Sequence, residues 1–368
     1  MENLEMKIFG NVYQGRRILL TGHTGFKGSW LALWLQELGA QLTGLALEPN
    51  TNPSHWDLLG LDFEEYRIDI RDKDAVAKVV QKTAPELVFH LAAQPLVNDS
   101  YDDPIKTWST NVMGTVNLLE SCRTQPSVGA ILVVTTDKCY ENREWEWGYR
   151  ETDRLGGHDP YSASKASVEL VVASYRRAFF SQLGAPLIAS ARAGNVIGGG
   201  DWSENRLIPD LMRAISNKAT LEVRYPHATR PWQHVLEALS GYLCLGQKMI
   251  EGRKEFSQAW NFGPGVDGNR TVLEVLSVLS RLKDLWPALN WKIVENTKNH
   301  HESNLLHLDS AKARQKLEWQ PVWSFDEGLQ ATANWYREKI ENELVISKEQ
   351  LKDYITSAEL LDLPWRPQ

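Results

Sequence analysis

The chain has 368 residues, a formal net charge of −7, 42% hydrophobic residues and 24% charged residues. This length can bury a sizeable core, and the composition is that of an ordinary globular enzyme. The acidic balance argues against nucleic acid as a partner, so an anionic ligand needs local Arg or Lys groups. No apolar run reaches the roughly 18 residues of a membrane span, and the start lacks a signal-peptide pattern, so we expect no membrane partner.

The three cysteines, Cys122, Cys139 and Cys244, have spacings that match neither a metal site nor an even disulfide framework. Such thiols are typical of a reducing compartment, so we predict a cytoplasmic protein without a metal site. The chain also has 15 tryptophans. Stacking on bases or sugars is open to some of them, but we expect most to pack in the core and at interfaces.

The first half of the chain alternates apolar strands with amphipathic helices, which is typical of a parallel sheet covered on both faces. Asp72 and Asp159 suit helix N-caps, and Pro160 suits the first helical position. The predicted fold class is therefore α/β, a Rossmann-type doubly wound parallel sheet. The predicted strands are 17–21, 41–47, 87–92, 130–136 and 187–192, the predicted helices are 26–38, 73–82, 104–122 and 159–180, and 141–153 is a predicted loop.

Three glycines, Gly22, Gly25 and Gly28, follow the first predicted strand and open a helix. Such glycines provide a tight turn, a close approach of backbone to phosphate and a close contact of helix with strand. The helix N-terminus offers unpaired N–H groups and a partial positive charge to a pyrophosphate. We therefore predict a dinucleotide site that contains Thr21, Gly22, Thr24, Gly25, Phe26, Lys27 and Gly28.

The second strand lacks the acidic residue expected at its end, where such a residue binds a cofactor ribose. Glu48 comes slightly later and either reaches the ribose from the loop or is a solvated carboxylate. No Arg stands nearby in the sequence to hold a 2′-phosphate, so NAD is predicted rather than NADP. Further cofactor contacts are expected from later strand ends and the following helix, at Asp69, Ile70, Leu91, Ala92, Ala93, Thr110 and Thr135.

Tyr161 and Lys165 are four residues apart on one predicted helix, so they share a face. A phenol with a pKa near 10 is a poor base at neutral pH. A neighbouring ammonium and the positive charge of an oxidised nicotinamide would lower that pKa. A Tyr and a Lys at this spacing often occur by chance, so the pair indicates catalysis only together with the residues around it.

Thr135 and Thr136 end the preceding strand, and a hydroxyl there would orient the reacting oxygen. Asp137 and Lys138 follow at the carboxyl end of a central strand, where ligands bind in such sheets. A turn with two solvated charges is the alternative interpretation of that pair. Together with the helix, the pattern favours a catalytic set of Thr136, Asp137, Lys138, Tyr161 and Lys165.

Motifs along nearly the whole chain resemble the extended short-chain dehydrogenase/reductases, namely the glycine turn, 90–93, Asn111, 135–137, Tyr161 with Lys165, and 317–321. Longer strings at 136–140, 148–151, 191–202 and 230–235 are more specific and resemble the CDP-glucose 4,6-dehydratases, in the nucleotide-sugar-modifying branch. The resemblance implies conversion of CDP-glucose to CDP-4-keto-6-deoxyglucose and water, with tightly held NAD regenerated in each cycle.

The resemblance also implies roles for individual residues. Tyr161 would take the proton of the sugar 4-hydroxyl during oxidation at C4, and Thr136 would bind the 4-oxygen. Lys165 would position the ribose and tune the phenol. The C4 ketone then acidifies C5–H, Asp137 protonates the departing 6-hydroxyl, and hydride returns to C6.

Lys138 departs from the pattern of the related dTDP-glucose dehydratases, which have a Glu there as the base at C5. A desolvated lysine with a depressed pKa can act as a base. Alternatively, Lys138 stabilises the developing enolate while another group takes the proton. We hypothesise that it acts at C5–C6.

Substrate contacts are expected after residue 194, where glycines, loops and mixed elements replace the regular alternation. The resemblance implies contacts from Gln94, Asn195, Trp202, Arg206, Leu207 and Arg230. Arginine holds phosphate bidentately, although surface ion pairs for the arginines and core packing for Trp202 are alternatives. The segment 301–302 lies where related enzymes often have a nucleotide-binding Arg, so that contact stays open. We predict an NAD-binding domain over 13–198 with returning segments near 230–262, and a smaller, sequence-discontinuous α/β domain over 199–229 and 263–360 that mainly binds the nucleotide sugar.

Several alternatives remain at this stage. A nucleotide-sugar 4-epimerase or decarboxylase would keep Tyr161 and Lys165, and a dehydratase for dTDP- or GDP-sugars is the nearest rival. A cofactor-sensing protein would need neither residue. Apolar stripes on the helices 104–122 and 159–180 predict a homodimer or homotetramer through an intersubunit helix bundle, with ordinary packing on the sheet as the alternative.

Overall fold

The computed structural model describes residues 8–282, 289–294 and 305–367. Its centre is a seven-stranded sheet in the order β11-β6-β5-β4-β1-β2-β3, in which every neighbouring pair is parallel. The predicted Rossmann-type fold class is therefore confirmed. The strands are β1 (Arg17–Thr21), β2 (Gln41–Ala46), β3 (Glu64–Arg67), β4 (Leu87–His90), β5 (Ala130–Val134), β6 (Leu187–Ala193) and β11 (Ala259–Phe262).

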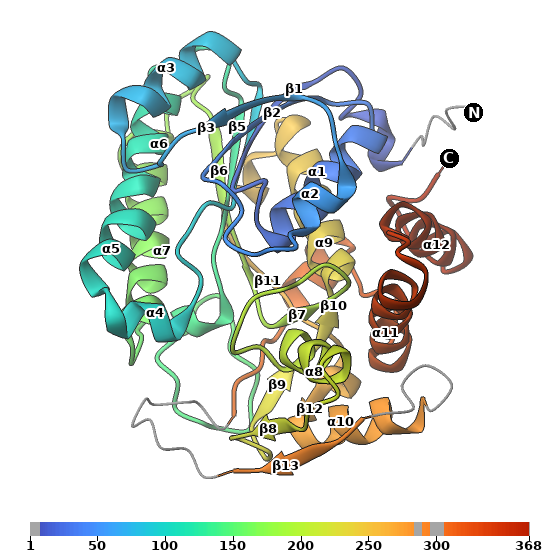
Figure 1. The fold of residues 1–368 in the computed structure, drawn as a ribbon. Helices are drawn as coiled ribbons and strands as arrows, with labels where there is room; N and C mark the ends of the chain where they lie inside the picture. The colour runs from blue at the N-terminus through green and yellow to red at the C-terminus, as the bar shows by residue number, and fades with distance from the viewer. Residues whose placement is uncertain (1–7, 283–288, 295–304, 368) are drawn as a thin grey trace.

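Helices cover both faces of this sheet (Figure 1). One face carries α3 (Lys73–Thr83), α6 (Gly114–Arg123) and α7 (Pro160–Ala178), and the other carries α1 (Phe26–Glu37) and α9 (Val235–Ile250). The predicted helix 104–122 is one continuous helical path that consists of α5 (Pro104–Trp108), a π-helical turn η2 (Ser109–Met113) and α6. Short helices α2 (His55–Leu59) and α4 (Val97–Asp102) were not predicted.

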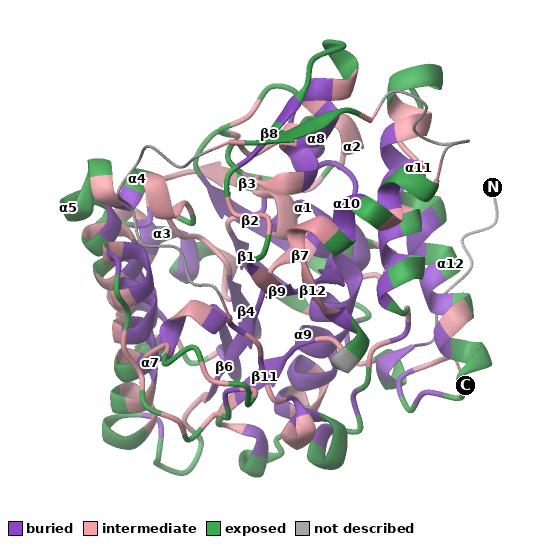
Figure 2. Ribbon diagram, turned by 90° about the horizontal axis from the view of Figure 1, so that it is seen from below, coloured by how far each residue is buried: buried purple, intermediate pink, exposed green. Residues whose placement is uncertain are grey.

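The central strands are buried on both faces, and their residues alternate between two apolar cores. Ile18 and Leu20 pack in the core with α1 and α9, whereas Leu19 packs in the core with α3, α6 and α7. This alternation follows from the period of two in a strand. Figure 2 shows the resulting continuous buried layer through the sheet. No described helix combines the length and the apolar character needed to cross a membrane.

The remaining elements lie beyond the carboxyl ends of the central strands, at the lower end of Figure 1. They comprise α8 (Leu207–Ser216), α10 (Val272–Arg281) and three two-stranded pairings: β7 (Val196–Ile197) with β10 (Gln233–His234), β9 (Thr229–Pro231) with β12 (Asn269–Thr271), and β8 (Leu221–Val223) with β13 (Trp291–Ile293). Two long helices, α11 (Phe325–Asn342) and α12 (Ser347–Leu360), end the chain beside α1 and α9.

Two strands end two residues earlier than predicted. β4 ends at His90 instead of residue 92, and β5 ends at Val134 instead of residue 136. The residues that follow leave the sheet as turns, including the 3₁₀ turn η3 (Asp137–Cys139). These turns contain predicted site residues, which therefore lie just beyond the carboxyl ends of β4 and β5.

Candidate active site

The glycine turn after β1 forms a backbone cradle. Gly22 has φ +76°, and a Cβ there would lie 2.7 Å from the backbone nitrogen of Ala92. A Cβ on Gly28 would lie 2.0 Å from the carbonyl oxygen of Gly22. Both positions therefore exclude side chains, and α1 begins directly afterwards at Phe26 with Gly25 as its N-cap. A helix N-terminus behind a close-packed glycine turn fits the pyrophosphate of a dinucleotide.

Hydrogen bonds fix the neighbouring turn 91–94. The Thr21 hydroxyl lies 2.7 Å from His90 Nδ1 and accepts from the Ala92 N–H at 3.2 Å. Asn111 accepts from the Gln94 N–H at 2.8 Å and donates to the Ser164 hydroxyl at 2.9 Å. Asn111 thereby joins the ends of β4 and α7 across the site.

An arginine that is distant in the sequence lies near Glu48 in space. Arg67 Nε lies 3.5 Å from Glu48 Oε1, and Arg67 Nη2 lies 2.9 Å from Glu65 Oε1. Arg67 ends β3, which pairs with β2, so the arginine is close in space although distant in sequence. Its charge is matched by two carboxylates, whereas recognition of a 2′-phosphate needs an available cation.

Two other predicted cofactor residues have protein partners. The Asp69 carboxylate pairs with Arg71 at 2.6 Å near the surface. The Thr135 hydroxyl donates to Glu169 Oε1 at 2.5 Å in the interior. Thr136, the next residue, directs its hydroxyl to Asp137 Oδ1 instead. Of the two threonines, therefore, Thr136 has its hydroxyl in the site, whereas the Thr135 hydroxyl points to Glu169.

Tyr161 and Lys165 enter the site from the start of α7. Asp159 caps this helix by accepting from the Ser162 N–H at 2.9 Å, and Pro160 occupies its first turn. Lys165 Nζ donates to the Val134 carbonyl at 2.9 Å, which fixes the ammonium at the end of β5. Burial lowers the pKa of Lys165 to about 8, against the charge of Glu169, which raises it.

Burial and the groups around the phenol act on the pKa of Tyr161 in opposite directions. Burial raises the pKa of Tyr161 above its ordinary value. A hydrogen bond with Thr136 and the charge of Arg206 act in the opposite direction and lower it. The phenol is thus a group whose ionisation depends on hydrogen bonds and positive charge brought into contact with it.

Asp137 is buried beside these groups, with 1% of its surface exposed. Its Oδ1 accepts from the Thr136 hydroxyl at 3.0 Å, and its Oδ2 has no hydrogen-bond partner among the described residues. Burial raises the pKa of Asp137, while the charges of Lys138, Arg230 and Lys27 lower it. A buried carboxyl with a raised pKa and an open oxygen is suited to donate a proton.

Cations surround this cluster even though the chain is acidic overall. Burial and the charge of Arg206 lower the pKa of Lys27 to about 8. Arg206 Nη1 lies 2.9 Å from Asp201 Oδ2, and this carboxylate raises the pKa of Arg206. The sequence did not single out Asp201, although it precedes the predicted Trp202. Such a group of positive charges suits an anionic ligand.

The other predicted substrate residues differ in their surroundings. A Cβ on Gly194 would lie 2.9 Å from Asp137 Oδ2 and 2.5 Å from Pro231 Cγ, so the segments carrying Asn195 and Arg230 adjoin Asp137. Trp202 packs edge-on against Tyr336 at 5.4 Å between ring centroids. Leu207 begins α8.

The side chain of Gln94 has hydrogen-bond partners in its own loop and on α5. Gln94 Nε2 donates to the Leu96 carbonyl at 3.0 Å and to the Thr107 hydroxyl at 2.9 Å. The segment 301–302 lies outside the described residues.

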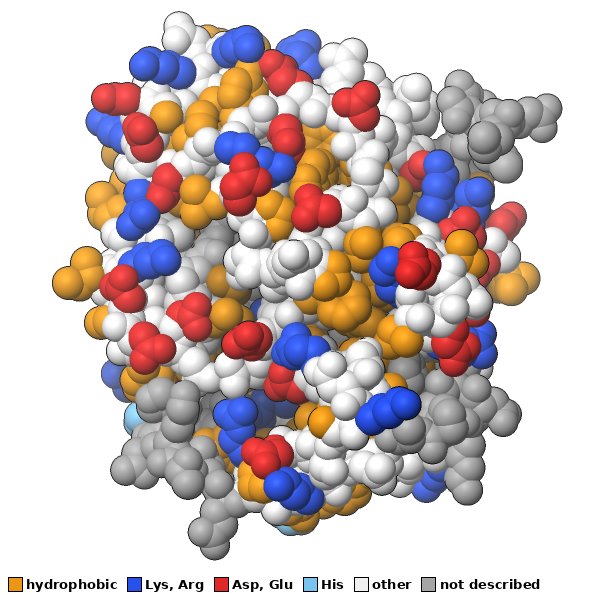
Figure 3. Space-filling view, viewed as in Figure 1, with side chains coloured by type: hydrophobic (Ala, Val, Ile, Leu, Met, Phe, Trp, Pro, Cys, Tyr) orange, Lys and Arg blue, Asp and Glu red, His pale blue; other side chains and the backbone are white. Residues whose placement is uncertain are grey.

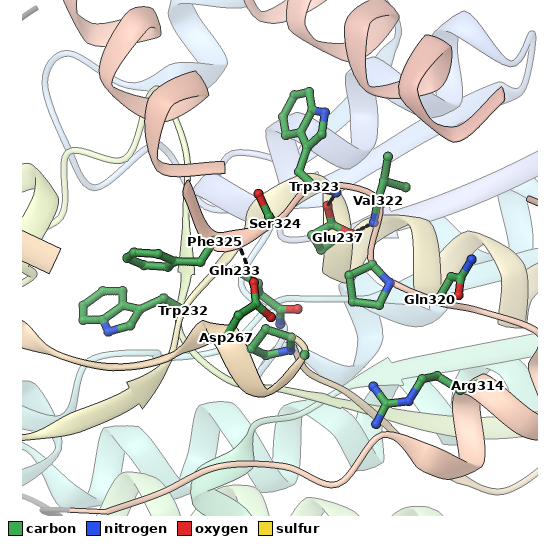
Figure 4. Close-up of a pocket in the computed structure, with 13 residues that line it drawn as sticks. Trp232, Gln233, Glu237, Asp267, Arg314, Gln320, Val322, Trp323, Ser324 and Phe325 are labelled. Atoms are coloured by element: carbon green, nitrogen blue, oxygen red, sulfur yellow. Dashed lines mark hydrogen bonds between the residues drawn. The ribbon is translucent and has the colours of Figure 1, made fainter. Parts of the chain in front are cut away.

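A separate pocket of about 320 Å³ lies between the 264–267 loop and the 320–325 segment (Figure 4). It contains none of the predicted site residues. Glu237 lies at its inner wall, where its carboxylate accepts from the Val322 and Trp323 N–H groups at 2.9 Å each. Tyr354 donates to the same carboxylate at 2.8 Å, so this acid holds the carboxyl-terminal segment in place.

Comparisons with known proteins agree with this site. The family described as GDP-mannose 4,6-dehydratase matches residues 19–332. The CDP-glucose 4,6-dehydratase of Salmonella typhimurium is 45% identical over 357 residues, which cover 94% of this chain and 98% of that protein. Nucleotide-sugar enzymes with the same overall fold are also found among solved structures.

An epimerase from Methanothermobacter thermautotrophicus aligns with a TM-score of 0.80 and 26% identity, over 92% of this chain and 97% of that one. A dTDP-glucose 4,6-dehydratase from Streptomyces venezuelae, solved with NAD and TYD bound, aligns with a TM-score of 0.73 and 26% identity, over 87% of this chain and 97% of that one. The chain therefore belongs to the GDP-mannose 4,6-dehydratase family, which confirms the predicted membership of the short-chain dehydrogenase/reductases.

Proposed function

We propose that the protein is an NAD-dependent CDP-glucose 4,6-dehydratase, which converts CDP-D-glucose to CDP-4-keto-6-deoxy-D-glucose and water. The 45% identity to a CDP-glucose 4,6-dehydratase over nearly the full length supports the nucleotide and the sugar. The main structural support for the reaction is the buried cluster of Thr136, Asp137 and Tyr161. In this cluster Asp137 Oδ2, which has no hydrogen-bond partner among the described residues, lies near the Tyr161 phenol. Oxidation needs the phenol, and loss of water needs the acid.

The backbone cradle at Gly22, Gly25 and Gly28 would hold the cofactor pyrophosphate, and Lys165 would contact the nicotinamide ribose. When bound, NAD supplies the acceptor and donor of a hydride. Glu48 and Arg67 would lie at the adenosine end, because they follow β2 and β3 at the same edge of the sheet.

Tyr161 takes the proton of the sugar 4-hydroxyl in the proposed reaction. Forming a phenolate in a buried site is costly, so the charge of Arg206 stabilises it, and contact with the Thr136 hydroxyl also lowers the pKa of Tyr161. Thr136 also orients the 4-oxygen, since its hydroxyl lies between Tyr161 and Asp137.

Asp137 supplies the proton that leaves with the 6-hydroxyl. Its raised pKa keeps a larger fraction of the carboxyl protonated near neutral pH than an exposed aspartate would have. Lys138 follows on the same 3₁₀ turn, and its backbone N–H donates to the Thr136 hydroxyl at 3.3 Å. The position of Lys138 beside Asp137 on this turn supports our hypothesis that Lys138 acts at C5–C6.

The diphosphate of the sugar nucleotide would lie near Asn195, Arg206 and Arg230. The two arginines, with Lys27 close by, supply the local positive charge required in an acidic protein. We further propose the division into an NAD-binding domain over 13–198 with 230–262, and a nucleotide-sugar domain over 199–229 and 263–360. The pairing of β11 with β6 and of β10 with β7 supports the assignment of the returning segment.

We also propose that the enzyme is a homodimer. Large apolar side chains are exposed on α5, η2 and α7, where the exposed fractions are 82% for Ile105, 40% for Trp108, 52% for Met113 and 60% for Leu170. Figure 3 shows hydrophobic side chains at the edge of the molecule over α5. An exposed apolar surface of this kind is typical of an interface between subunits.

Mass spectrometry of reaction products tests the function. The purified protein is incubated with CDP-, dTDP-, UDP- and GDP-glucose without added reductant. We expect a product lighter by one water from CDP-glucose and little turnover of the others. A product of unchanged mass would indicate epimerisation, and dehydration of another sugar nucleotide would reassign the substrate.

A further inference from the structure

A buried ion pair lies directly behind the catalytic groups. Glu169 of α7 and Arg192 of β6 are 2.7 Å apart, and their side chains are 3% and 4% exposed. Glu169 follows Lys165 by one helical turn on the same helix, so the two residues share a face of α7. Neither Glu169 nor Arg192 belongs to the predicted catalytic set.

The Glu169 carboxylate connects α7 to both adjacent strands. Its Oε1 accepts from the Thr135 hydroxyl after β5 at 2.5 Å, and its Oε2 accepts from the Ser190 hydroxyl of β6 at 2.7 Å. Arg192 in turn donates to the Tyr140 hydroxyl at 2.7 Å. The network therefore extends from the catalytic helix through the sheet to the far end of the Thr136–Tyr140 segment.

The charges that face Glu169 come from each element packed against it. Arg192 lies on β6, and Lys165 and Arg176 lie on α7. Cys139 at the end of the 3₁₀ turn η3 also faces Glu169, but burial raises the pKa of this thiol and keeps it neutral. Arg192 lowers the pKa of Glu169 despite its burial, so the carboxylate stays ionised. Its charge raises the pKa of Lys165, against the lowering by burial.

Stability alone is a weak reason for such a pair. Replacing a buried ion pair by apolar groups of similar volume is often neutral or stabilising, because both charges must be desolvated. Arg192 Nε also has no hydrogen-bond partner among the described residues, so this network is incompletely satisfied. The Glu169 charge is better explained by its electrostatic effect on the Lys165 ammonium, which lies one helical turn away.

We propose that Glu169 is a positioning residue for the catalytic helix, which fixes α7 against β5 and β6 and supplies the negative charge that faces Lys165. This inference rests on the proposed dehydratase function. Glu169 acts through Lys165 and Thr135 and does not itself touch the substrate.

The test compares Glu169→Gln and the double variant Glu169→Gln/Arg192→Met with the native enzyme. The double variant leaves no unpaired buried cation, so it should fold even if Glu169→Gln alone does not. We measure kcat/KM for CDP-glucose against pH and, independently of turnover, the NAD dissociation constant against pH by tryptophan fluorescence. In Glu169→Gln, activity and affinity should be lost on the alkaline side at a pH about one unit lower, a tenfold change in the acid constant of Lys165. The double variant should shift in the same direction but less, because it also loses the opposing charge of Arg192.

Glu237→Gln is the matched control, because Glu237 is also a buried carboxylate with several hydrogen bonds but lies in α9. Its alkaline limb should remain at the native position. Three results would overturn the proposal. The alkaline limb of the pH profile could stay unchanged in folded Glu169 variants, or Glu237→Gln could shift it equally. The third is that neither Glu169 variant yields folded protein. Native protein that fails to dehydrate CDP-glucose would refute the proposed function instead, and the NAD titrations would still report on Glu169.

Discussion

Replacing Asp137 with Asn should separate the two halves of the proposed reaction. Asn has the same shape and keeps an oxygen for the Thr136 hydroxyl, which lies 3.0 Å from Asp137 Oδ1. The change removes a negative charge that raises the pKa of Tyr161, so removal of the 4-hydroxyl proton should not become harder. It also removes the carboxyl whose pKa burial raises, so the elimination loses its proton donor.

Loss of a general acid slows its step by about 10²–10⁴-fold, which corresponds to a barrier increase of roughly 3–5 kcal/mol. Because the elimination needs this acid and the oxidation does not, Asp137→Asn should oxidise CDP-glucose and then stop. Stopped-flow absorbance should show reduced nicotinamide accumulating on the variant but remaining low on the native enzyme. Normal turnover by the variant without such accumulation would refute the role of Asp137.

Three further changes probe other parts of the site. Lys138→Ala should slow the loss of deuterium from C5 of labelled substrate, followed by NMR, and loss at the native rate would exclude a role at C5–C6. Asp201→Asn should raise KM for CDP-glucose about tenfold with little change in kcat, because Asp201 holds Arg206 through a 2.9 Å contact; an effect on kcat alone would contradict this. Burial raises the pKa of Glu237 from 4.5 to about 7, so the native state binds the proton more tightly than the unfolded chain. The free energy of unfolding should therefore fall by about 3 kcal/mol as pH rises through this interval. Chemical denaturation of the native protein and Glu237→Gln measures this, and equal pH slopes for both would show that Glu237 is not responsible.

Local patterns were sufficient to predict most strands of the sheet and the catalytic helix. The apolar runs at 17–21 and 130–134 are long enough to mark buried strands, and Asp159 with Pro160 marks the start of α7. Tyr161 and Lys165 then share a face because four residues nearly complete a helical turn. Their approach to Asp137 follows from the parallel sheet, in which strand ends meet at one edge.

Contacts between distant segments were not predictable in the same way. Arg67 lies beside Glu48 because β2 pairs with β3, and no local pattern in the sequence gives that register. Alternation along the chain could have separated Thr135 from Thr136, since adjacent residues in an extended segment point to opposite sides. The partner of Thr135, Glu169, was missed because an acidic residue within a helix usually faces solvent.

The burial of Tyr161 was not predictable for a related reason. Its spacing from Lys165 indicates proximity, but the burial that raises its pKa depends on the assembled fold. Lys165 also directs its ammonium to the Val134 carbonyl, a contact that requires knowledge of where β5 ends.

The central claim is that one site removes hydrogen from C4 of the hexose and returns it to C6 after water has left. CDP-glucose carrying deuterium at C4 tests this directly, with the product analysed by NMR and mass spectrometry. The account predicts a 4-keto-6-deoxy sugar with the deuterium on C6. Deuterium that remains on C4 of a sugar that has lost no water would contradict it.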